Sequence, residues 1–94
     1  MSLHRRNAKR DLVEAEIKAA LVKCGFSVHS VSSAGHPDLT VWREDKGLLL
    51  VECKSRGGRL TKAQKDFMLE FAGCPNIIIG VSAEQVLREV GVTS

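Results

Sequence analysis

Three charged residues in strand-like segments carry the chemistry that this sequence could perform. Asp38 opens one apolar segment, and Glu52 and Lys54 follow the apolar run Leu48–Val51. Ionised groups in a covered strand are costly unless they are paired or bind a metal ion. Because strand side chains alternate between the two faces, Glu52 and Lys54 point the same way. Two carboxylates on one face with an ammonium beside them form a workable site for phosphodiester hydrolysis.

A divalent cation is the cofactor that this residue set favours. Carboxylate oxygens are hard ligands that suit Mg²⁺ or Mn²⁺. Such an ion polarises a phosphate and lowers the pKa of a bound water, while Lys54 orients that water or stabilises charge on the phosphate. The alternative is a cross-strand ion pair of Lys54 with Asp38 or Glu52, which contributes about 0–1 kcal/mol to stability and has no catalytic role.

The register of a hairpin decides whether these side chains meet. The predicted antiparallel strands 38–44 and 48–54 leave three residues between them for the loop. That register places Asp38 opposite Lys54 and diagonal to Glu52, within reach of one cation. A two-residue loop would break the arrangement unless a bulge restored it.

Hydrophobic periodicity and capping residues predict the element order αβββαβα. An apolar stripe indicates the first helix, and Thr61 and Ser82 are typical N-caps of the two later helices. We expect strands 48–54 and 77–79 to be covered on both faces, since both contain unbroken apolar runs. The expected elements are a helix over 11–24, strands over 26–31, 38–44 and 48–54, a helix over 61–71 with Phe67, Met68 and Phe71 inward, a strand over 77–79 and a helix from Ser82 to about Gly91.

The composition indicates one soluble globular domain in a reducing cytoplasm. The chain has 94 residues, of which 44% are apolar and 27% charged, and no segment resembles a membrane span or a signal peptide. The three cysteines, in apolar surroundings, are odd in number and too widely spaced for a zinc site, which favours reduced structural thiols. They are Cys24, Cys53 and Cys74.

Positive charge is concentrated at the start of the chain. Residues 1–10 have a net charge of +4 and the remainder −1. We therefore expect a basic arm, 1–10, followed by a single domain, 11–94, and a polyanionic partner such as nucleic acid. A solubilising frayed terminus is the alternative. The basic residues of the arm are Arg5, Arg6, Lys9 and Arg10.

Three motifs in order resemble those of a nuclease superfamily. They are GHPDL at 35–39, VECK at 51–54 and LTKAQ at 60–64. The first two resemble the PD-(D/E)xK superfamily, and all three are similar to its VRR-NUC domain, the virus-type replication–repair nuclease module. The resemblance spans residues 12–80. It implies an α/β fold with a restriction-endonuclease-like αβββαβ core, in which a mixed central sheet is flanked by helices.

The resemblance also implies roles for individual residues. Asp38, Glu52 and the backbone carbonyl of Cys53 would bind the metal, and Lys54 would assist the attacking water. The family tends to place a further acid on the first helix. The helical wheel does not choose between Glu14 and Glu16, but similarity to the first helix of archaeal Holliday-junction resolvases favours Glu14 as a catalytic and metal-binding residue. A solvated helix flank is the alternative.

Gln64 has two interpretations. The resemblance makes it an active-site residue on the helix after the ExK strand, whereas the spacing Thr61-x-x-Gln64 is that of a capping box, in which Gln64 only caps the helix. His36 is interpreted as a loop residue or DNA contact. Trp42 is interpreted as a core or interface residue.

The expected activity is that of a Mg²⁺- or Mn²⁺-dependent DNA endonuclease without a small-molecule cofactor. Size and resemblance predict a homodimer acting on branched DNA such as Holliday junctions, in a phage or bacterial cytoplasm and away from membranes. The alternatives are a non-catalytic nucleic-acid-binding module and a small scaffold or inhibitor protein. Besides the arm, the residues expected to follow DNA phosphates are Arg56, Arg59, Lys62 and Lys65, for which a solvated charged face is the alternative.

Overall fold

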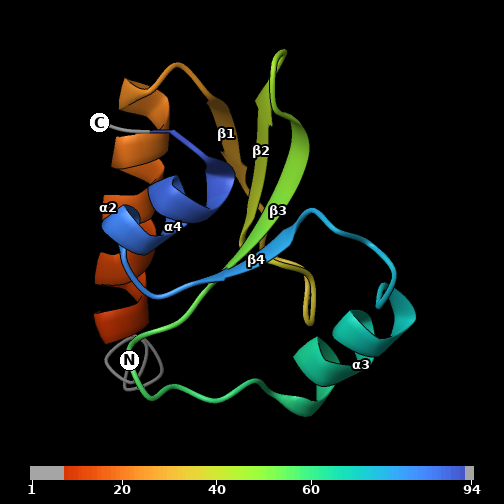
Figure 1. Ribbon diagram of the computed structural model, residues 1–94. Coiled ribbons are helices and arrows are strands. Elements are labelled where there is room, and N and C mark those ends of the chain that lie inside the picture. The colour runs from red at the N-terminus through yellow and green to blue at the C-terminus, as the bar shows by residue number, and fades with distance from the viewer. Residues whose placement is uncertain (1–7, 93–94) are drawn as a thin grey trace.

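The computed structural model describes residues 8–92, with side chains from residue 11 onward. The elements follow the predicted order αβββαβα, and the fold class is α/β (Figure 1). Their bounds are α2 (Ala8–Lys23), β1 (Ser27–Ser30), β2 (Leu39–Arg43), β3 (Gly47–Cys53), α3 (Lys62–Glu70), β4 (Ile77–Gly80) and α4 (Ala83–Val90).

Helix α2 packs through the predicted apolar stripe. Ile17 and Leu21 are fully buried, and Gly25, at a φ of 90°, follows the end of the helix in the left-handed conformation that suits glycine. The helix begins at Ala8, so the predicted start at residue 11 was three residues late. The predicted basic arm otherwise lies outside the described residues: Arg5 and Arg6 entirely, and Lys9 and Arg10 in their side chains.

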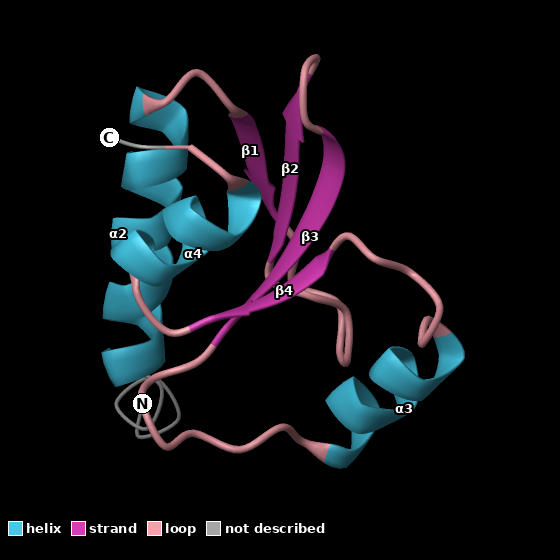
Figure 2. Ribbon diagram, viewed as in Figure 1, coloured by secondary structure: helices cyan, strands magenta, loops and turns pink. Residues whose placement is uncertain are grey.

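The four strands form one mixed sheet in the order β1-β2-β3-β4. The first three are antiparallel neighbours, and β4 runs parallel to β3. Helices α2 and α4 lie against the same face of this sheet, whereas α3 stands apart from both (Figure 2). The core lies between the sheet and these two helices, and its fully buried side chains include Ile17, Leu21, Leu39, Val41, Val51 and Val86.

The other face of the sheet, which we call the outer face, is exposed over part of its area. Leu49 and Val51 point into the core, but Leu48 is 52% exposed and its cross-strand neighbour Trp42 is 49% exposed. On β4, Ile79 is 44% exposed. The prediction of cover on both faces was therefore wrong at Leu48 and Ile79, because both packed helices lie on the same side, and the core interpretation of Trp42 was wrong for the same reason. Towards the end of β3 the outer face is covered, since Glu52 is buried.

The β2–β3 hairpin has the predicted loop length but a different register. The loop is residues 44–46, and Arg43 pairs with Gly47. The amide of Lys46 donates to the carbonyl of Arg43 at 2.9 Å, and Gly47 has a φ of 78°. A tight turn followed by a left-handed residue is a common three-residue hairpin connection. The glycine therefore begins β3 rather than ending the loop, which shifts the register by two from the predicted one.

The C-terminal elements follow their capping signals. Thr61 caps α3 and Ser82 caps α4, which ends at Gly91. The inward prediction fails for Phe71, which is 42% exposed, and the predicted apolar surroundings fail for Cys74, which is exposed. Between residues 8 and 92, no helix is long and apolar enough to cross a membrane.

Candidate active site

Asp38 lies at the entrance of β2 and is fixed on both sides. Its backbone carbonyl accepts a hydrogen bond from the Val31 amide at 2.8 Å, which extends the β1–β2 ladder by one residue. Its Oδ2 accepts from the backbone amide of Cys53 at 2.8 Å. The carboxylate thus takes the place of a strand carbonyl at the end of the β2–β3 pair, which holds it beside the end of β3.

The observed register places Asp38 opposite Glu52. The predicted register had placed it opposite Lys54. Leu39 pairs with Val51, so the next position places Asp38 across from Glu52 on the outer face. Because the carbonyl of Asp38 points to β1, this is a non-hydrogen-bonded position, where side chains of neighbouring strands approach most closely. Cross-strand Cβ atoms at such positions are about 4.5–5.5 Å apart. The two carboxylates therefore share one face at short range, as the site requires.

The side chain of Gln64, which lies on α3, contacts the charged groups of Glu52 and Lys54. Its Nε2 donates to Glu52 Oε2 at 2.9 Å, and its Oε1 accepts from Lys54 Nζ at 2.7 Å. Lys54 Nζ also lies 3.6 Å from Glu52 Oε2. Glu52 has no exposed surface, and Asp38, Lys54 and Gln64 are also buried. These four residues form a compact buried cluster, which we call the acidic cluster.

The donor set of the acidic cluster fits a divalent cation. Two carboxylates and one ammonium have a net charge of −1, and buried charge of this kind is stabilised by a cation. Lys54 donates its backbone amide to Gly80 on β4, so the amide and carbonyl of Cys53 point to the other side, where Asp38 lies. Carboxylate and carbonyl oxygens on one side are the ligands that Mg²⁺ and Mn²⁺ prefer.

Glu14 lies on the helix-covered side of the sheet. Its carboxylate accepts a hydrogen bond from Ser30 Oγ at 3.4 Å, and Ser30 pairs with Leu39, whose side chain points into the core. Glu14 is half-buried, whereas Glu16 is exposed. No group of three or more His, Cys, Asp and Glu side chains within the described range is arranged to hold a metal ion. The choice between Glu14 and Glu16 as the helix acid therefore stays a prediction, and the structure does not place either residue in a three-acid cluster within the described range.

Gln64 forms the predicted capping box and also contacts the acidic cluster. Its backbone amide donates to Thr61 Oγ1 at 3.2 Å, and its side-chain Oε1 accepts from the Thr61 amide at 2.8 Å, which completes the capping box. The same Oε1 accepts from Lys54. The capping box therefore fixes the side chain that reaches the acidic cluster, so the two interpretations do not exclude each other.

The loop before β2 holds α3 against the site. A Cβ added at Gly35, which has a φ of 80°, would lie 2.8 Å from the carbonyl oxygen of Ala63, so only glycine permits this approach. The His36 ring contacts the edge of Phe67 at 5.2 Å between centroids, and Phe67 stacks on Phe71. Sequence reasoning missed this array, although the spacing of Phe67 and Phe71 by four residues on a helix predicts their contact.

The predicted DNA-contacting residues near the site are exposed. Arg56, Arg59 and Lys65 lie on the surface, and Lys62 forms an ion pair with Asp66 at 3.0 Å. None of the four is drawn into the acidic cluster. Arg56 and Arg59 lie on the segment between β3 and α3, and Lys62 and Lys65 lie in the first turns of α3.

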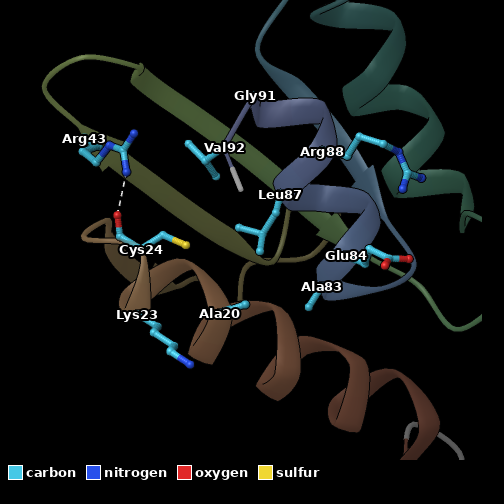
Figure 3. A pocket seen from close by; sticks show the side chains of 10 residues that line it. All are labelled: Ala20, Lys23, Cys24, Arg43, Ala83, Glu84, Leu87, Arg88, Gly91 and Val92. Carbon is cyan, nitrogen blue, oxygen red and sulfur yellow. Dashed lines mark hydrogen bonds between the residues drawn. The ribbon is translucent and has the colours of Figure 1, made fainter. Parts of the chain in front are cut away.

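A groove of about 880 Å³ lies elsewhere, between α2 and α4 (Figure 3). Arg43 borders it and donates to the Cys24 carbonyl at 2.6 Å and to Asp45 at 2.6 and 2.9 Å. The hydrogen bond with Arg43 holds the pKa of Asp45 below its ordinary value of 3.8 and raises the pKa of Arg43. The guanidinium also lies 4.4 Å from the Phe26 ring centroid. These contacts stabilise the hairpin, and the groove is lined by none of the acidic cluster.

Comparison with known protein families agrees with the resemblance carried by the three motifs. The family model of the VRR-NUC domain matches residues 2–86, which is most of the chain. Comparisons with curated proteins and with solved structures find no match. The order αβββαβα is consistent with a restriction-endonuclease-like core, and the VRR-NUC domain implies a nuclease of the PD-(D/E)xK type. The chain belongs to the VRR-NUC family.

Proposed function

We propose that this protein is a divalent-metal-dependent DNA endonuclease that hydrolyses phosphodiester bonds. Family membership supports nuclease chemistry on DNA. The observation that carries the mechanism is the acidic cluster, where Asp38 and Glu52 share one face and Gln64 bridges Glu52 to Lys54. Buried charge at this density is expensive for folding alone, so a functional reason for it is favoured.

Asp38, Glu52 and the Cys53 carbonyl are the residues that would hold Mg²⁺ or Mn²⁺. When bound, such an ion supplies charge stabilisation on the phosphate and a more acidic water. Asp38 is held in place by the Cys53 amide and Glu52 by Gln64, so both ligands are oriented before the cation arrives. We propose Glu14 as the acid of the first helix that supplements this set.

Lys54 is the group that would act on the attacking water or on charge at the phosphate. Its ammonium is held 2.7 Å from Gln64 Oε1 and 3.6 Å from Glu52 Oε2, so its position is defined. An ammonium that is fixed beside developing negative charge stabilises the transition state without reorganising. The exposed bases Arg56, Arg59 and Lys62 would follow the DNA backbone, together with the basic residues of the arm.

We propose further that the protein is a homodimer that prefers branched DNA such as Holliday junctions. A domain of 94 residues has little surface on which to hold a branched substrate, and a two-fold dimer presents two active sites for cuts in two strands. The exposed apolar side chains of the outer face, Trp42, Leu48 and Ile79, supply a surface that a second copy would cover. Leu48→Lys is expected to reduce the light-scattering mass from about 20 kDa to about 10 kDa, because a charge at the interface opposes association.

Cleavage assays with matched variants test the nuclease proposal. Labelled four-way junction, linear duplex and single strand are incubated with Mg²⁺, Mn²⁺ or EDTA. Asp38→Asn, Glu52→Gln and Lys54→Met should each abolish cleavage, whereas Glu44→Gln, a change at an exposed acid in the β2–β3 loop, should not.

Each contrary result removes a defined part of the proposal. Cleavage that persists in EDTA contradicts the metal mechanism. Equal cleavage of duplex and junction contradicts the preference for branched DNA. DNA binding without cleavage, with an affinity unchanged by Asp38→Asn, indicates a non-catalytic binding module.

A further inference from the structure

One face of α3 contacts the acidic cluster at the N-terminal end of the helix and is exposed to solvent at the C-terminal end. Gln64, Phe67, Met68 and Phe71 are spaced at i, i+3, i+4 and i+7, so they lie on the same side of the helix. Gln64 is buried at one end, Phe67 and Met68 are half-buried, and Phe71 is 42% exposed at the other end. The face of α3 that contacts the site is therefore covered by the rest of the protein at Gln64 but not at Phe71.

The rings on this face are arranged as a stack. The centroids of Phe67 and Phe71 lie 4.3 Å apart with 11° between the ring planes, and the His36 ring meets Phe67 at 62°. Phe67 thus contacts both His36 and Phe71, and Phe71 is the exposed member of the stack. An aromatic ring already held in place loses little conformational entropy when another flat ring packs on it.

The charge around this stack favours a polyanion as its occupant. The segment 54–71 has five basic and two acidic residues, a net charge of +3. All of its bases except Lys54 are exposed. The exposed charged residues of this segment are four bases and two acids, a net charge of +2. Positive surface charge is unfavourable for a second copy that presents the same charge, and it is complementary to nucleic acid. The bases are Lys54, Arg56, Arg59, Lys62 and Lys65, and the acids are Asp66 and Glu70.

We propose that Phe71, stacked on Phe67, is a platform for an unpaired nucleotide base of the DNA substrate. This inference rests on the proposed nuclease function and narrows its substrate class to DNA with unpaired bases near the cut. Phe71 lies seven residues from Gln64, about 10 Å along the helix axis. That distance corresponds to about three nucleotides at the duplex rise of about 3.4 Å, and fewer in an extended strand.

An unpaired base can use the platform, whereas a base inside a duplex cannot. In a duplex the bases stack on one another and their faces are hidden, whereas in a single strand, flap or junction arm opening they are accessible to an aromatic side chain. The platform would therefore raise affinity for single-stranded and flapped DNA and leave affinity for blunt duplex unchanged. A duplex is still bound through its phosphates by the exposed bases.

Equilibrium binding in EDTA tests the platform separately from cleavage. Fluorescence anisotropy measures the affinity of the full chain for a labelled single strand, the same strand in a flapped duplex, and the same strand in a blunt duplex. The variants are Phe71→Ala and Phe71→Leu, the second of which keeps apolar packing against Phe67 but removes the ring. Leu69→Ala is the matched control, because Leu69 is 75% exposed on the same helix but off this face.

Both Phe71 variants should weaken binding of the single strand and the flap by about 5- to 150-fold while blunt duplex changes by less than about twofold, since stacking of one base contributes about 1–3 kcal/mol. Leu69→Ala should change none of the three. A strand with 2-aminopurine in place of one base should lose fluorescence on binding the wild type, and lose less on binding Phe71→Leu. Thermal melting followed by circular dichroism verifies that each variant is folded.

Three results would overturn the platform. Unchanged single-strand affinity in Phe71→Leu shows that the ring is not used. An equal loss for blunt duplex shows a general effect on binding. A drop in light-scattering mass for Phe71→Ala without loss of single-strand affinity shows that the stack contacts a second copy. If the wild-type protein cleaves DNA with Mn²⁺ and the variants give any of these results, the platform is refuted and the nuclease proposal stands. If binding depends on the ring but no DNA is cleaved, the nuclease proposal is refuted and the platform stands.

Discussion

Gln64→Ala should destabilise the protein and also impair its chemistry, because one side chain both caps α3 and holds two charged groups. Loss of a capping interaction costs about 0.5–2 kcal/mol. The substitution also removes a hydrogen bond to the Glu52 carboxylate and another from the Lys54 ammonium, and bonds to charged groups contribute about 1.5–3 kcal/mol each. Because water enters the space and solvates the released groups in part, we expect a net loss of about 2–4 kcal/mol.

Thr61→Ala is the matched comparison. It removes the hydroxyl that accepts from the Gln64 amide but leaves the Gln64 side chain, which Lys54, Glu52 and the Thr61 amide still hold. This variant should lose only about 0.5–2 kcal/mol and retain most of its cleavage rate. In a domain of this size each kcal/mol lowers the melting midpoint by about 4–8 °C, so the two variants are distinguishable by calorimetry.

Cleavage kinetics separate positioning from capping. Gln64→Ala should lower kcat by about tenfold or more with little change in KM, because loss of one positioned hydrogen-bonding group is felt in the transition state. Gln64→Glu places a second negative charge beside Glu52, so Mn²⁺ should raise its melting midpoint more than that of the wild type. Equal stability losses for Gln64→Ala and Thr61→Ala, together with an unchanged kcat in both, would refute the positioning role and leave Gln64 as a cap.

Three further perturbations have definite expected outcomes. Asp38→Asn should maintain or raise the melting midpoint of the metal-free protein, because it removes one of two neighbouring buried carboxylates. It should also abolish the rise in melting midpoint that Mn²⁺ causes, and a retained rise contradicts the role of Asp38 as a metal ligand. Gly35→Ala should cost more stability than Gly57→Ala, since both have a positive φ but only the first places a Cβ against α3, and equal losses by calorimetry would show that the contact is not tight. Arg43→Gln should return the pKa of Asp45 toward 3.8 in an NMR titration; the wild-type pair stabilises the fold above that pH and loses this contribution as pH falls through the lowered pKa, so an unchanged titration refutes the pairing.

Much of the secondary structure follows from local signals in the sequence. Thr61 and Ser82 act as N-caps, and Gly25 and Gly91 follow helix ends at positive φ, because these features depend on neighbouring residues only. The start of α2 was predicted late because Asp11 resembles a first residue although it lies within the first turn. Such errors move a boundary without changing the element.

Predictions that depended on packing between distant segments of the chain were wrong at several residues. The run Leu48–Val51 predicted a strand covered on both faces, yet Leu48 is half-exposed because α2 and α4 pack on one side. Phe71 was predicted inward from helix periodicity, which identifies the face it shares with Phe67 but not where the covering protein ends. Periodicity shows which side chains point together, and the packing partner is set by the rest of the chain.

The sequence by itself indicated which side chains are candidates for chemistry, and it determined that Glu52 and Lys54 share a face, since strand alternation needs no tertiary information. Only the tertiary structure decided that Asp38 lies opposite Glu52, because a turn at Lys46 and Gly47 shifted the hairpin register by two. It also decided that Gln64 reaches the charged pair, because the docking of α3 brings together residues that local energetics cannot relate.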